Sequence, residues 1–121
     1  MDPEHHILLV EDDPSTRDAM ALALQLQGYK VVTAADGQAA LDHLRDDGRP
    51  CVILLDLMMP VLDGWAFRQR QQQDPHLAAI PVVVVSADGS VPQKAAALGA
   101  ADYLQKPVDV DELVAAVRRH C

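Results

Sequence analysis

The sequence predicts a doubly wound α/β domain, in which a five-stranded parallel sheet of order 2-1-3-4-5 is covered by helices on both faces. The first observation is alternation, because five short apolar runs are each followed by a longer stretch of helical periodicity. The second is composition: half of the 121 residues are hydrophobic but only 3% are aromatic, so the core must be aliphatic. A chain of this length suits one domain with a sizeable core.

The strand candidates differ in polarity, and this difference predicts their order in the sheet. The runs 7–10, 52–55 and 82–85 are apolar throughout, as strands in the middle of a parallel sheet must be. The other two runs contain charged or amide side chains, which suit strands at the edges. The expected strands are 7–10, 30–34, 51–55, 80–85 and 101–105.

Each helix candidate begins or ends at a residue that suits a helix terminus. An aspartate can cap four of the starts, and glycines or basic residues stand at the ends. Pro60 is expected to form a turn before the third helix. The expected start and end residues are, in chain order, Asp13 and Gly28, Asp36 and Gly48, Asp63, Ser90 and Gly99, and Asp109 and Arg119.

Charge and hydropathy exclude several classes of protein. The formal net charge of −8 argues against direct binding to nucleic acid or to an anionic membrane surface. No apolar stretch reaches 18 residues, and the acidic, polar residues 1–6 do not resemble a signal peptide. For Cys51 and Cys121 we expect no disulfide; two thiols fit a reducing cytoplasm, with Cys51 packed in the core.

Reactive side chains are predicted to gather where the strands end. Glu11 and Asp12 follow the first run, and Asp56 follows the third. In a sheet of this order, a ligand lies beyond the carboxyl ends of strands 1 and 3. Two carboxylates about 4 Å apart repel by about 4 kcal/mol at an effective dielectric near 20, so the cluster either holds a proton or binds a cation. Oxygen ligands without cysteine or histidine favour Mg²⁺.

Two further strand ends supply groups that suit an anion. Ser86 can donate a hydrogen bond, and Lys106 can pair with a carboxylate or with a phosphoryl oxygen. Asp56 is then the expected nucleophile of aspartyl-phosphate chemistry, in which catalysis is mostly positioning and charge neutralisation. The alternative is that the acids serve only as capping or dipole-stabilising groups.

The segments LLVEDDPSTR, LLDLMMPVLDGW, VVVVSADGS and ADYLQKP resemble the receiver domain of bacterial two-component response regulators. The resemblance covers about residues 6–120 and is specific because the motifs occur in order, each at a strand end. It implies one receiver domain over 1–121 with the (βα)5 flavodoxin-like fold, a three-layer sandwich. It also implies a doubly wound sheet in the order already expected.

The resemblance implies a role for each site residue. Asp56 matches the phospho-acceptor, and Glu11 and Asp12 match the acids that hold Mg²⁺ or Mn²⁺. Met58 matches the residue whose backbone carbonyl binds the metal. The switch and phosphate-contacting residues would be Ser86, Lys106 and Tyr103, and the Lys106–Pro107 peptide bond is a candidate cis bond.

The function that follows is phosphorelay signalling in the cytoplasm. A histidine kinase or histidine phosphotransfer protein would donate the phosphoryl group to Asp56. Phosphorylation would then change the surface formed by the fourth helix, fifth strand and fifth helix, whose output partner is unknown. We expect no enzymatic activity beyond self-phosphorylation from phospho-donors and autodephosphorylation. The chain ends after the fifth helix, which suits either a stand-alone regulator or an excised domain.

Two alternative functions remain for this chain. An Asp-nucleophile phosphohydrolase or phosphotransferase would need a second acid at the position of Met58, and a degenerate receiver would not need the complete acid, serine and lysine set. In the transcription-factor branch of the family, charged residues of the fourth and fifth helices pair two receivers. Pro92 and Ala116 stand at two of the matching positions, which suggests a monomer or weak dimer.

Several other residues are expected to have only structural roles. Trp65 and Phe67 should be packing anchors, and residues 69–73 should form a solvated helix face. The histidines share no metal-binding spacing and are expected at the surface; they are His5, His6, His43, His76 and His120.

Overall fold

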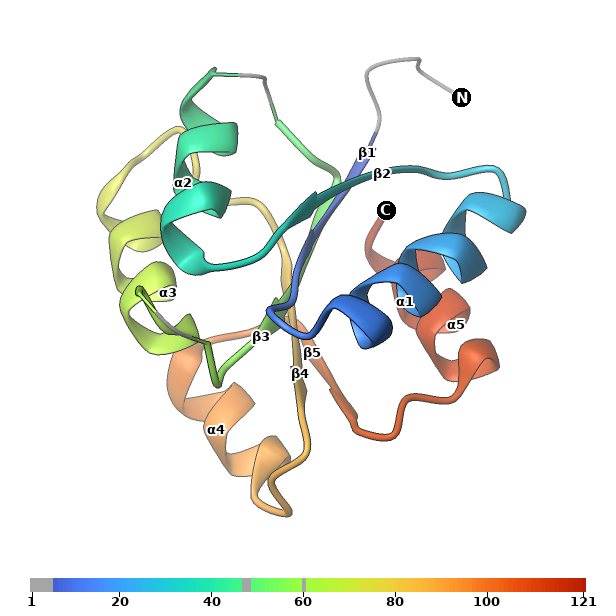
Figure 1. The fold of residues 1–121 in the computed structure, drawn as a ribbon. Helices are drawn as coiled ribbons and strands as arrows, with labels where there is room; N and C mark the ends of the chain where they lie inside the picture. Colours follow the sequence, from blue (N-terminus) through green and yellow to red (C-terminus); the bar gives the residue numbers. More distant parts are fainter. Residues whose placement is uncertain (1–5, 47–48, 60) are drawn as a thin grey trace.

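The computed structural model describes residues 6–46, 49–59 and 61–121, in which strands and helices alternate five times (Figure 1). Gly48, Pro60 and His5, for which the sequence suggested roles, lie outside these residues. The strands are β1 (His6–Val10), β2 (Lys30–Ala34), β3 (Val52–Asp56), β4 (Val82–Ser86) and β5 (Asp102–Gln105). The helices are α1 (Pro14–Leu26), α2 (Gly37–Asp46), α3 (Gly64–Gln73), α4 (Val91–Leu98) and α5 (Val110–His120).

The five strands form one parallel sheet in the order β2-β1-β3-β4-β5, which confirms the predicted topology. In the register, Leu8 pairs with Val32 on one side and with Ile53 on the other. The central strands β1, β3 and β4 are buried along their whole length, whereas β2 and β5 contain exposed residues. The carboxyl ends of all five strands therefore meet at one rim of the sheet.

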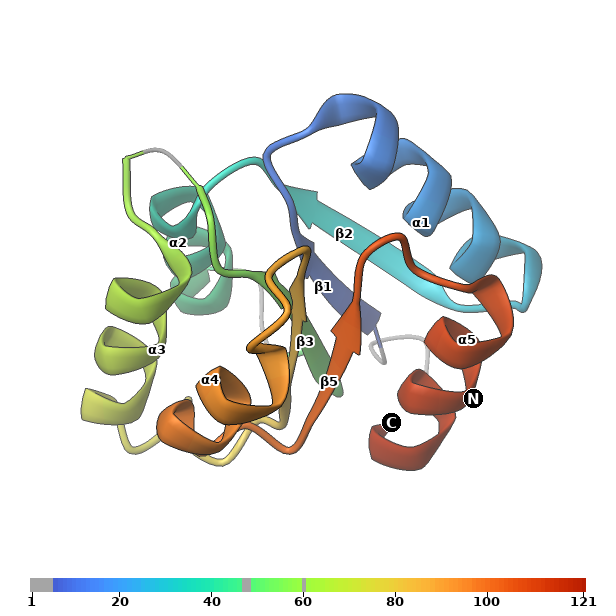
Figure 2. The same cartoon turned by 90° about the horizontal axis from the view of Figure 1, so that it is seen from below.

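The sheet separates two aliphatic clusters, and this makes the three layers seen in Figure 2. Along β1, Leu8 and Val10 belong to the cluster covered by α2, α3 and α4, while Ile7 and Leu9 belong to the one covered by α1 and α5. Successive strand residues point to opposite faces, so an apolar run is needed when both faces are covered. Phe67 of α3 is fully buried, as predicted.

Side chains cap the helices largely as the sequence predicts. The carboxylates of four aspartates accept a hydrogen bond from a backbone N–H in the first turn, which satisfies a donor that has no partner within the helix. The bonds are Thr16 N to Asp13 (2.9 Å), Ala39 N to Asp36 (2.8 Å), Ala66 N to Asp63 (2.9 Å) and Asp111 N to Asp109 (2.7 Å). Gly99 ends α4 at φ +66°, a left-handed conformation that favours glycine.

Helix α3 departs from the prediction at two positions. Trp65 is 40% exposed and is not a buried anchor, whereas Gln71, expected on a solvated face, is fully buried. Its amide donates to the carbonyls of Leu77 and Ile80, at 2.9 and 3.1 Å, and accepts from Arg68 at 2.8 Å. Gln71 is buried because the loop after α3 folds back over it and offers carbonyls that need donors.

His6 is also buried, contrary to the expectation that the histidines lie at the surface. Strand β1 begins at His6, one residue earlier than predicted, so this side chain stands within the sheet. Its Nε2 lies 3.0 Å from Nε2 of His43 in α2, and the two rings meet edge to face. A buried imidazole needs a polar partner, and α2 supplies one.

Cys51 and Cys121 form a disulfide, so the expectation of two free thiols is wrong. That expectation rested on composition and on the usual redox state of the cytoplasm. Neither shows how close the two cysteines lie in the folded chain. Cys51 immediately precedes β3, and α5 runs back along the sheet so that Cys121 arrives at the same end. The Cα atoms lie 5.0 Å apart, although 70 residues separate them in sequence.

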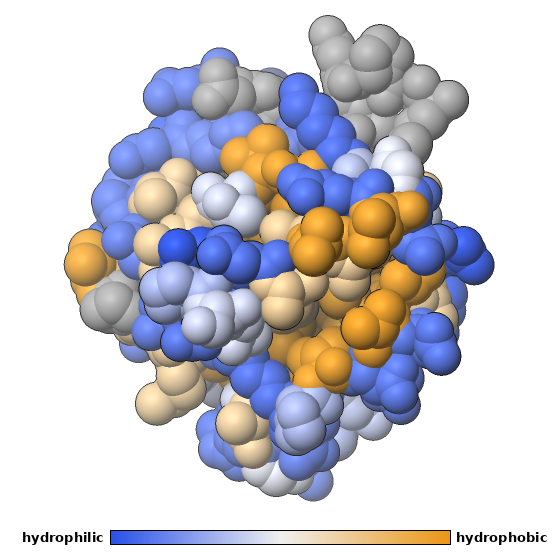
Figure 3. Space-filling model, turned by 45° about the vertical axis from the view of Figure 1, so that its right-hand side comes forward, coloured by the Kyte–Doolittle hydropathy of each residue, from blue (hydrophilic) through white to orange (hydrophobic). Residues whose placement is uncertain are grey.

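The face formed by α1 and α5 carries exposed apolar side chains, gathered in Figure 3. Leu22 and Leu26 of α1 are 56% and 76% exposed, and Val110 of α5 is 54% exposed.

No helix among the described residues is long and apolar enough to cross a membrane.

Candidate functional site

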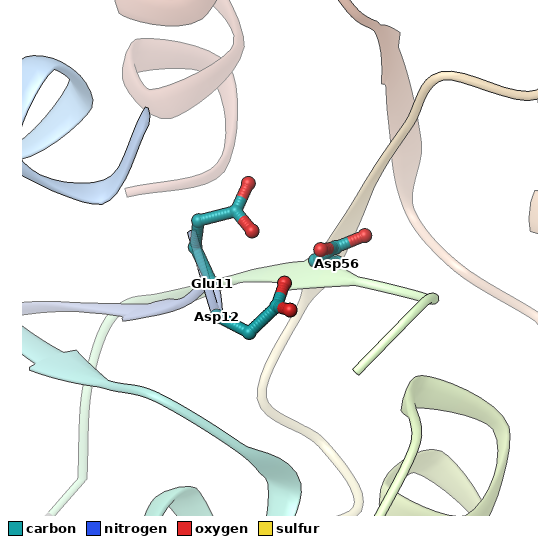
Figure 4. Close-up of side chains that lie close together, drawn as sticks. All are labelled: Glu11, Asp12 and Asp56. Carbon is teal, nitrogen blue, oxygen red and sulfur yellow. The ribbon is translucent and has the colours of Figure 1, made fainter. Parts of the chain in front are cut away.

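The site lies at the carboxyl rim of the sheet, where three carboxylates meet (Figure 4). Glu11 and Asp12 directly follow β1, and Asp56 is the last residue of β3. Because β1 and β3 are neighbours in the sheet, their ends bring these side chains together. One oxygen from each carboxylate lies within 4.8 Å of the others, and Glu11 and Asp56 are buried.

Lys106 supplies a positive charge to the same cluster from the end of β5. Its Nζ forms an ion pair with Oε1 of Glu11 and lies 3.5 Å from Oδ2 of Asp56. The Lys106–Pro107 peptide bond is cis, as the family resemblance implied. The ammonium therefore bridges the ends of β1 and β3 from a strand that is not adjacent to either.

The surroundings shift the pKa values of the two buried acids, Asp56 and Glu11, in opposite directions. Burial, a hydrogen bond with Glu11 and repulsion by Glu11 together raise the pKa of Asp56 to about 7. Burial alone would raise the pKa of Glu11, but hydrogen bonds with Asp56 and Lys106 outweigh it and lower that pKa. Near neutral pH the metal-free pair thus tends to hold one proton.

The residues present fit a magnesium ion. All the donors are carboxylate oxygens, the ligands that Mg²⁺ prefers, and no cysteine or histidine belongs to the cluster. The three carboxylates face the single ammonium of Lys106, so when they are ionised they leave negative charge for a divalent cation to neutralise. The amide of Met58 donates to Oδ1 of Asp56 at 3.2 Å, which places the backbone of residue 58 beside the cluster.

Ser86 and Tyr103 lie on the same face of the sheet as α4. Val82 and Val84 of β4 belong to the cluster under α4, and Ser86 continues their alternation. Leu104 of β5 belongs to the opposite cluster, so Tyr103 points to the face of Ser86. The Ser86 hydroxyl is buried and accepts from the amide of Asp88 at 3.3 Å, whereas Tyr103 is 44% exposed.

Two contacts that hold the site were not predicted from the sequence. Arg17 of α1 donates from Nη1 to the carbonyl of Glu11 at 3.1 Å and so fixes the backbone that carries both acids. Gly64 begins α3 so close to β3 that a Cβ there would lie 2.7 Å from the carbonyl oxygen of Asp56. Glycine in the Asp63-Gly64 pair was a visible signal for Gly64, but nothing in the sequence marked Arg17.

The loop after β4 is held by a small polar network. Asp88 accepts from the amide and hydroxyl of Ser90, at 2.9 and 2.8 Å, and pairs with Lys94 of α4. These contacts keep the pKa of Asp88 well below its ordinary value, with the Lys94 hydrogen bond as the largest cause. The network connects the loop that follows Ser86 with the first half of α4.

Comparisons with known proteins agree with this geometry. Residues 7–118 match the family model of the response regulator receiver domain. The chain is 41% identical over 117 residues to the DNA-binding dual master transcriptional regulator RpaA of Synechocystis, covering 93% of this chain and 47% of that protein. It thus spans about half the length of the curated relatives it matches.

Solved structures show the same fold. The chemotaxis protein CheY4 of Vibrio cholerae superposes with a TM-score of 0.87 at 30% identity, covering 97% of this chain and 98% of that one. The receiver domain of a sensor histidine kinase from Pseudomonas aeruginosa, solved with a magnesium ion coordinated in its active-site cleft, gives the same TM-score at 30% identity and covers 96% of each chain.

The fold and the rim of acids define a flavodoxin-like domain of the type found in CheY. More narrowly, the chain belongs to the family of response regulator receiver domains of two-component systems.

Proposed function

We propose that this receiver takes a phosphoryl group onto Asp56 and thereby switches a signalling surface. The observation that carries the proposal is the position of Asp56, buried at the end of β3 between Glu11, Asp12 and the ammonium of Lys106. A carboxylate in this setting can act as a nucleophile, because Lys106 and a cation held by Glu11 and Asp12 would neutralise the charge of the incoming phosphoryl group.

The transfer can be written with its atoms in balance. An oxygen of Asp56 bonds to phosphorus of a phosphohistidine, the phosphorus–nitrogen bond breaks, and the imidazole leaves and takes up a proton. Glu11, Asp12, Asp56 and the backbone of Met58 would hold Mg²⁺, or Mn²⁺, which neutralises phosphoryl oxygens when bound. Lys106 would then change partners from the carboxylates to a phosphoryl oxygen, and the Ser86 hydroxyl would donate a hydrogen bond to another.

The switch would follow from the shared face of Ser86 and Tyr103. A phosphoryl group adds about −1.5 to −2 charge, by analogy with other phosphorylated side chains. Movement of the Ser86 loop toward it would change the surroundings of Tyr103 and of α4. The surface of α4, β5 and α5 is the proposed output face, and its partner stays undefined.

A depression beside Lys106 could receive the protein that donates the phosphoryl group. A surface depression of about 560 Å³ opens between α1 and the loop that follows β5. It is lined mainly by apolar groups, on the face shown in Figure 3. Its lining residues are Ser15, Thr16, Ala19, Met20, Ala87, Lys106, Pro107 and Val108. We propose that a cytoplasmic histidine kinase or phosphotransfer protein docks here.

The chemistry does not require a separate enzymatic activity. Met58 stands where an Asp-nucleophile hydrolase would need its second acid, and its side chain is 72% exposed. We therefore propose that the chain only accepts and loses its own phosphoryl group.

Intact-mass measurement after incubation with acetyl phosphate and Mg²⁺ tests the proposal. The wild type should gain one phosphoryl group, and Asp56→Asn should gain none. Absence of an adduct on folded wild type would refute phospho-acceptance. Ala19→Arg tests docking separately, because it should slow transfer from a phosphohistidine protein and leave the acetyl phosphate reaction unchanged.

A further inference from the structure

The Cys51–Cys121 pair lies at the end of the sheet opposite the acidic site. Cys51 directly precedes β3, whose other end carries Asp56, and Cys121 directly follows α5. The pair is therefore one strand length away from the phosphorylation chemistry and belongs to none of the functions proposed above.

Both cysteines are held in place by contacts that do not depend on the disulfide. The amide of Cys51 donates to the carbonyl of His6 at 2.9 Å, and the amide of Cys121 donates to the carbonyl of Val117 at 2.8 Å. Both side chains also pack against the aliphatic cluster under α1 and α5. The two backbones should therefore keep their places when the disulfide is opened.

The last turn of α5 has a second anchor. Oδ2 of Asp102 accepts from Arg119 at 2.7 Å and lies 3.2 Å from Nε2 of His120. This contact ties the residues next to Cys121 to the start of β5. Two thiols on anchored backbones with Cα atoms 5.0 Å apart are close enough to re-form the bond.

The disulfide can be reached from solvent. Both cysteines are only half-buried, and they line a surface depression of about 300 Å³. Arg49 lines the same depression and carries a positive charge. Such surroundings favour the thiolate, the form that takes part in thiol–disulfide exchange. A disulfide that solvent reaches is also of the kind that reducing thiols can open.

We propose that Cys51 and Cys121 form a reversible redox site that exchanges with low-molecular-weight disulfides of the glutathione class. In the oxidising direction, one cysteine thiolate attacks a sulfur of oxidised glutathione and releases one glutathione thiolate. The second cysteine loses its proton, attacks the mixed disulfide and releases the other glutathione. The two cysteines are oxidised by two electrons, and one glutathione disulfide is reduced to two thiols.

The experiment equilibrates the purified chain with reduced and oxidised glutathione at varied ratios, followed by acid quenching, alkylation with iodoacetamide and intact-mass measurement. Oxidising mixtures should give a chain that takes no alkyl group, and reducing mixtures a chain that takes two, with reversal when the mixture is exchanged. Reduction should also lower the thermal midpoint by roughly 10 °C, because the bond closes a long loop.

Three results would overturn the proposal. They are two alkylatable thiols in every mixture, a stable glutathione adduct in place of the internal bond, or a disulfide that glutathione does not open in the folded protein. Cys51→Ser and Cys121→Ser are the matched controls and should each form only a mixed disulfide. Acetyl phosphate should phosphorylate the reduced and oxidised forms alike. A failure of the redox proposal can therefore be told apart from a failure of the proposed function.

Discussion

The two ends of the central strand β3 behave in opposite ways. At its carboxyl end, burial raises the pKa of Asp56 to about 7, and a hydrogen bond and repulsion from Glu11 add to the effect. At its amino end, Cys51 is joined by a covalent bond to Cys121, and backbone hydrogen bonds hold both residues. The carboxyl end carries acidic groups whose charge a divalent cation can neutralise, and the amino end carries a covalent cross-link that stabilises the fold.

This difference follows from the topology of parallel sheets. Each crossover returns the chain to the same side, so all carboxyl ends and their loops gather at one rim, where a ligand can meet several strands. Polar residues at that rim serve chemistry at some cost in stability. The opposite rim lies away from the proposed chemistry, so changes there should alter stability and leave phosphorylation unchanged.

The largest expected effect on stability comes from the amino rim. Opening the Cys51–Cys121 disulfide should lower the free energy of unfolding by about 2–4 kcal/mol, because the bond restricts a long loop in the unfolded chain. Urea unfolding with and without a reducing agent measures the difference. The phosphorylation rate should stay the same, and a parallel loss of that rate would contradict the separation of the two rims.

At the carboxyl rim, Gly64→Ala should affect both properties. A Cβ at Gly64 would lie 2.7 Å from the Asp56 carbonyl oxygen and from Cα of Leu57, so α3 and the end of β3 must move apart. Overpacking of this kind costs about 1–3 kcal/mol. Gly89→Ala is the matched control, because nothing lies within 4 Å of a Cβ there. Equal urea midpoints for the two variants would show that the close approach is unimportant.

Removing the ammonium should affect phosphorylation more than stability. Lys106→Met keeps most of the side-chain length but loses the charge beside Glu11 and Asp56. A hydrogen bond to a charged group contributes about 1.5–3 kcal/mol, which corresponds to about a 10- to 150-fold slower reaction with acetyl phosphate. Lys94→Met, on the exposed Asp88 pair, is the control and should change the rate little.

The smallest expected effect is the pH dependence of stability and of Mg²⁺ affinity near neutral pH. Because the pKa of Asp56 is raised, the metal-free fold binds a proton more tightly than the unfolded chain does. This contribution to stability is present at low pH and is lost as the pH rises through about 7. Binding of Mg²⁺ must displace that proton, so its affinity should rise by up to about tenfold per pH unit below 7 and level off above.

Calorimetric titrations with Mg²⁺ at several pH values provide the measurement. Asp56→Asn removes the titrating group and should flatten the dependence in this range. A wild-type affinity that does not change between pH 6 and 8 would show that the proton is held elsewhere.

The fold was largely predictable because its signals are local. The alternation of apolar runs with capped helical stretches predicted every strand and the sheet order, and the aspartates at four helix starts lie where the sequence indicated. The errors concern long-range packing. The burial of Gln71 depends on carbonyls of a later loop, and the disulfide depends on where α5 ends relative to β3.

The site was predictable to the level of which residues meet. Strand order alone brings Glu11 and Asp12 to Asp56, and the structure places them together. The raised pKa of Asp56 and the support of the Glu11 carbonyl by Arg17 could not be predicted, because they depend on depth of burial and on side-chain direction. Tyr103 lies on the face of Ser86, but its part in a switch stays a prediction.

Mapping the modified residue tests the proposal that Asp56 is the phospho-acceptor. The phosphorylated chain is reduced with borohydride, which converts an aspartyl phosphate to homoserine, and the peptides are sequenced by mass spectrometry. If Asp56 is the phospho-acceptor, homoserine should be found at position 56 only, and none should be found in Asp56→Asn. Homoserine at Asp12 or Asp13, or phosphate retained on a serine or histidine, would contradict it.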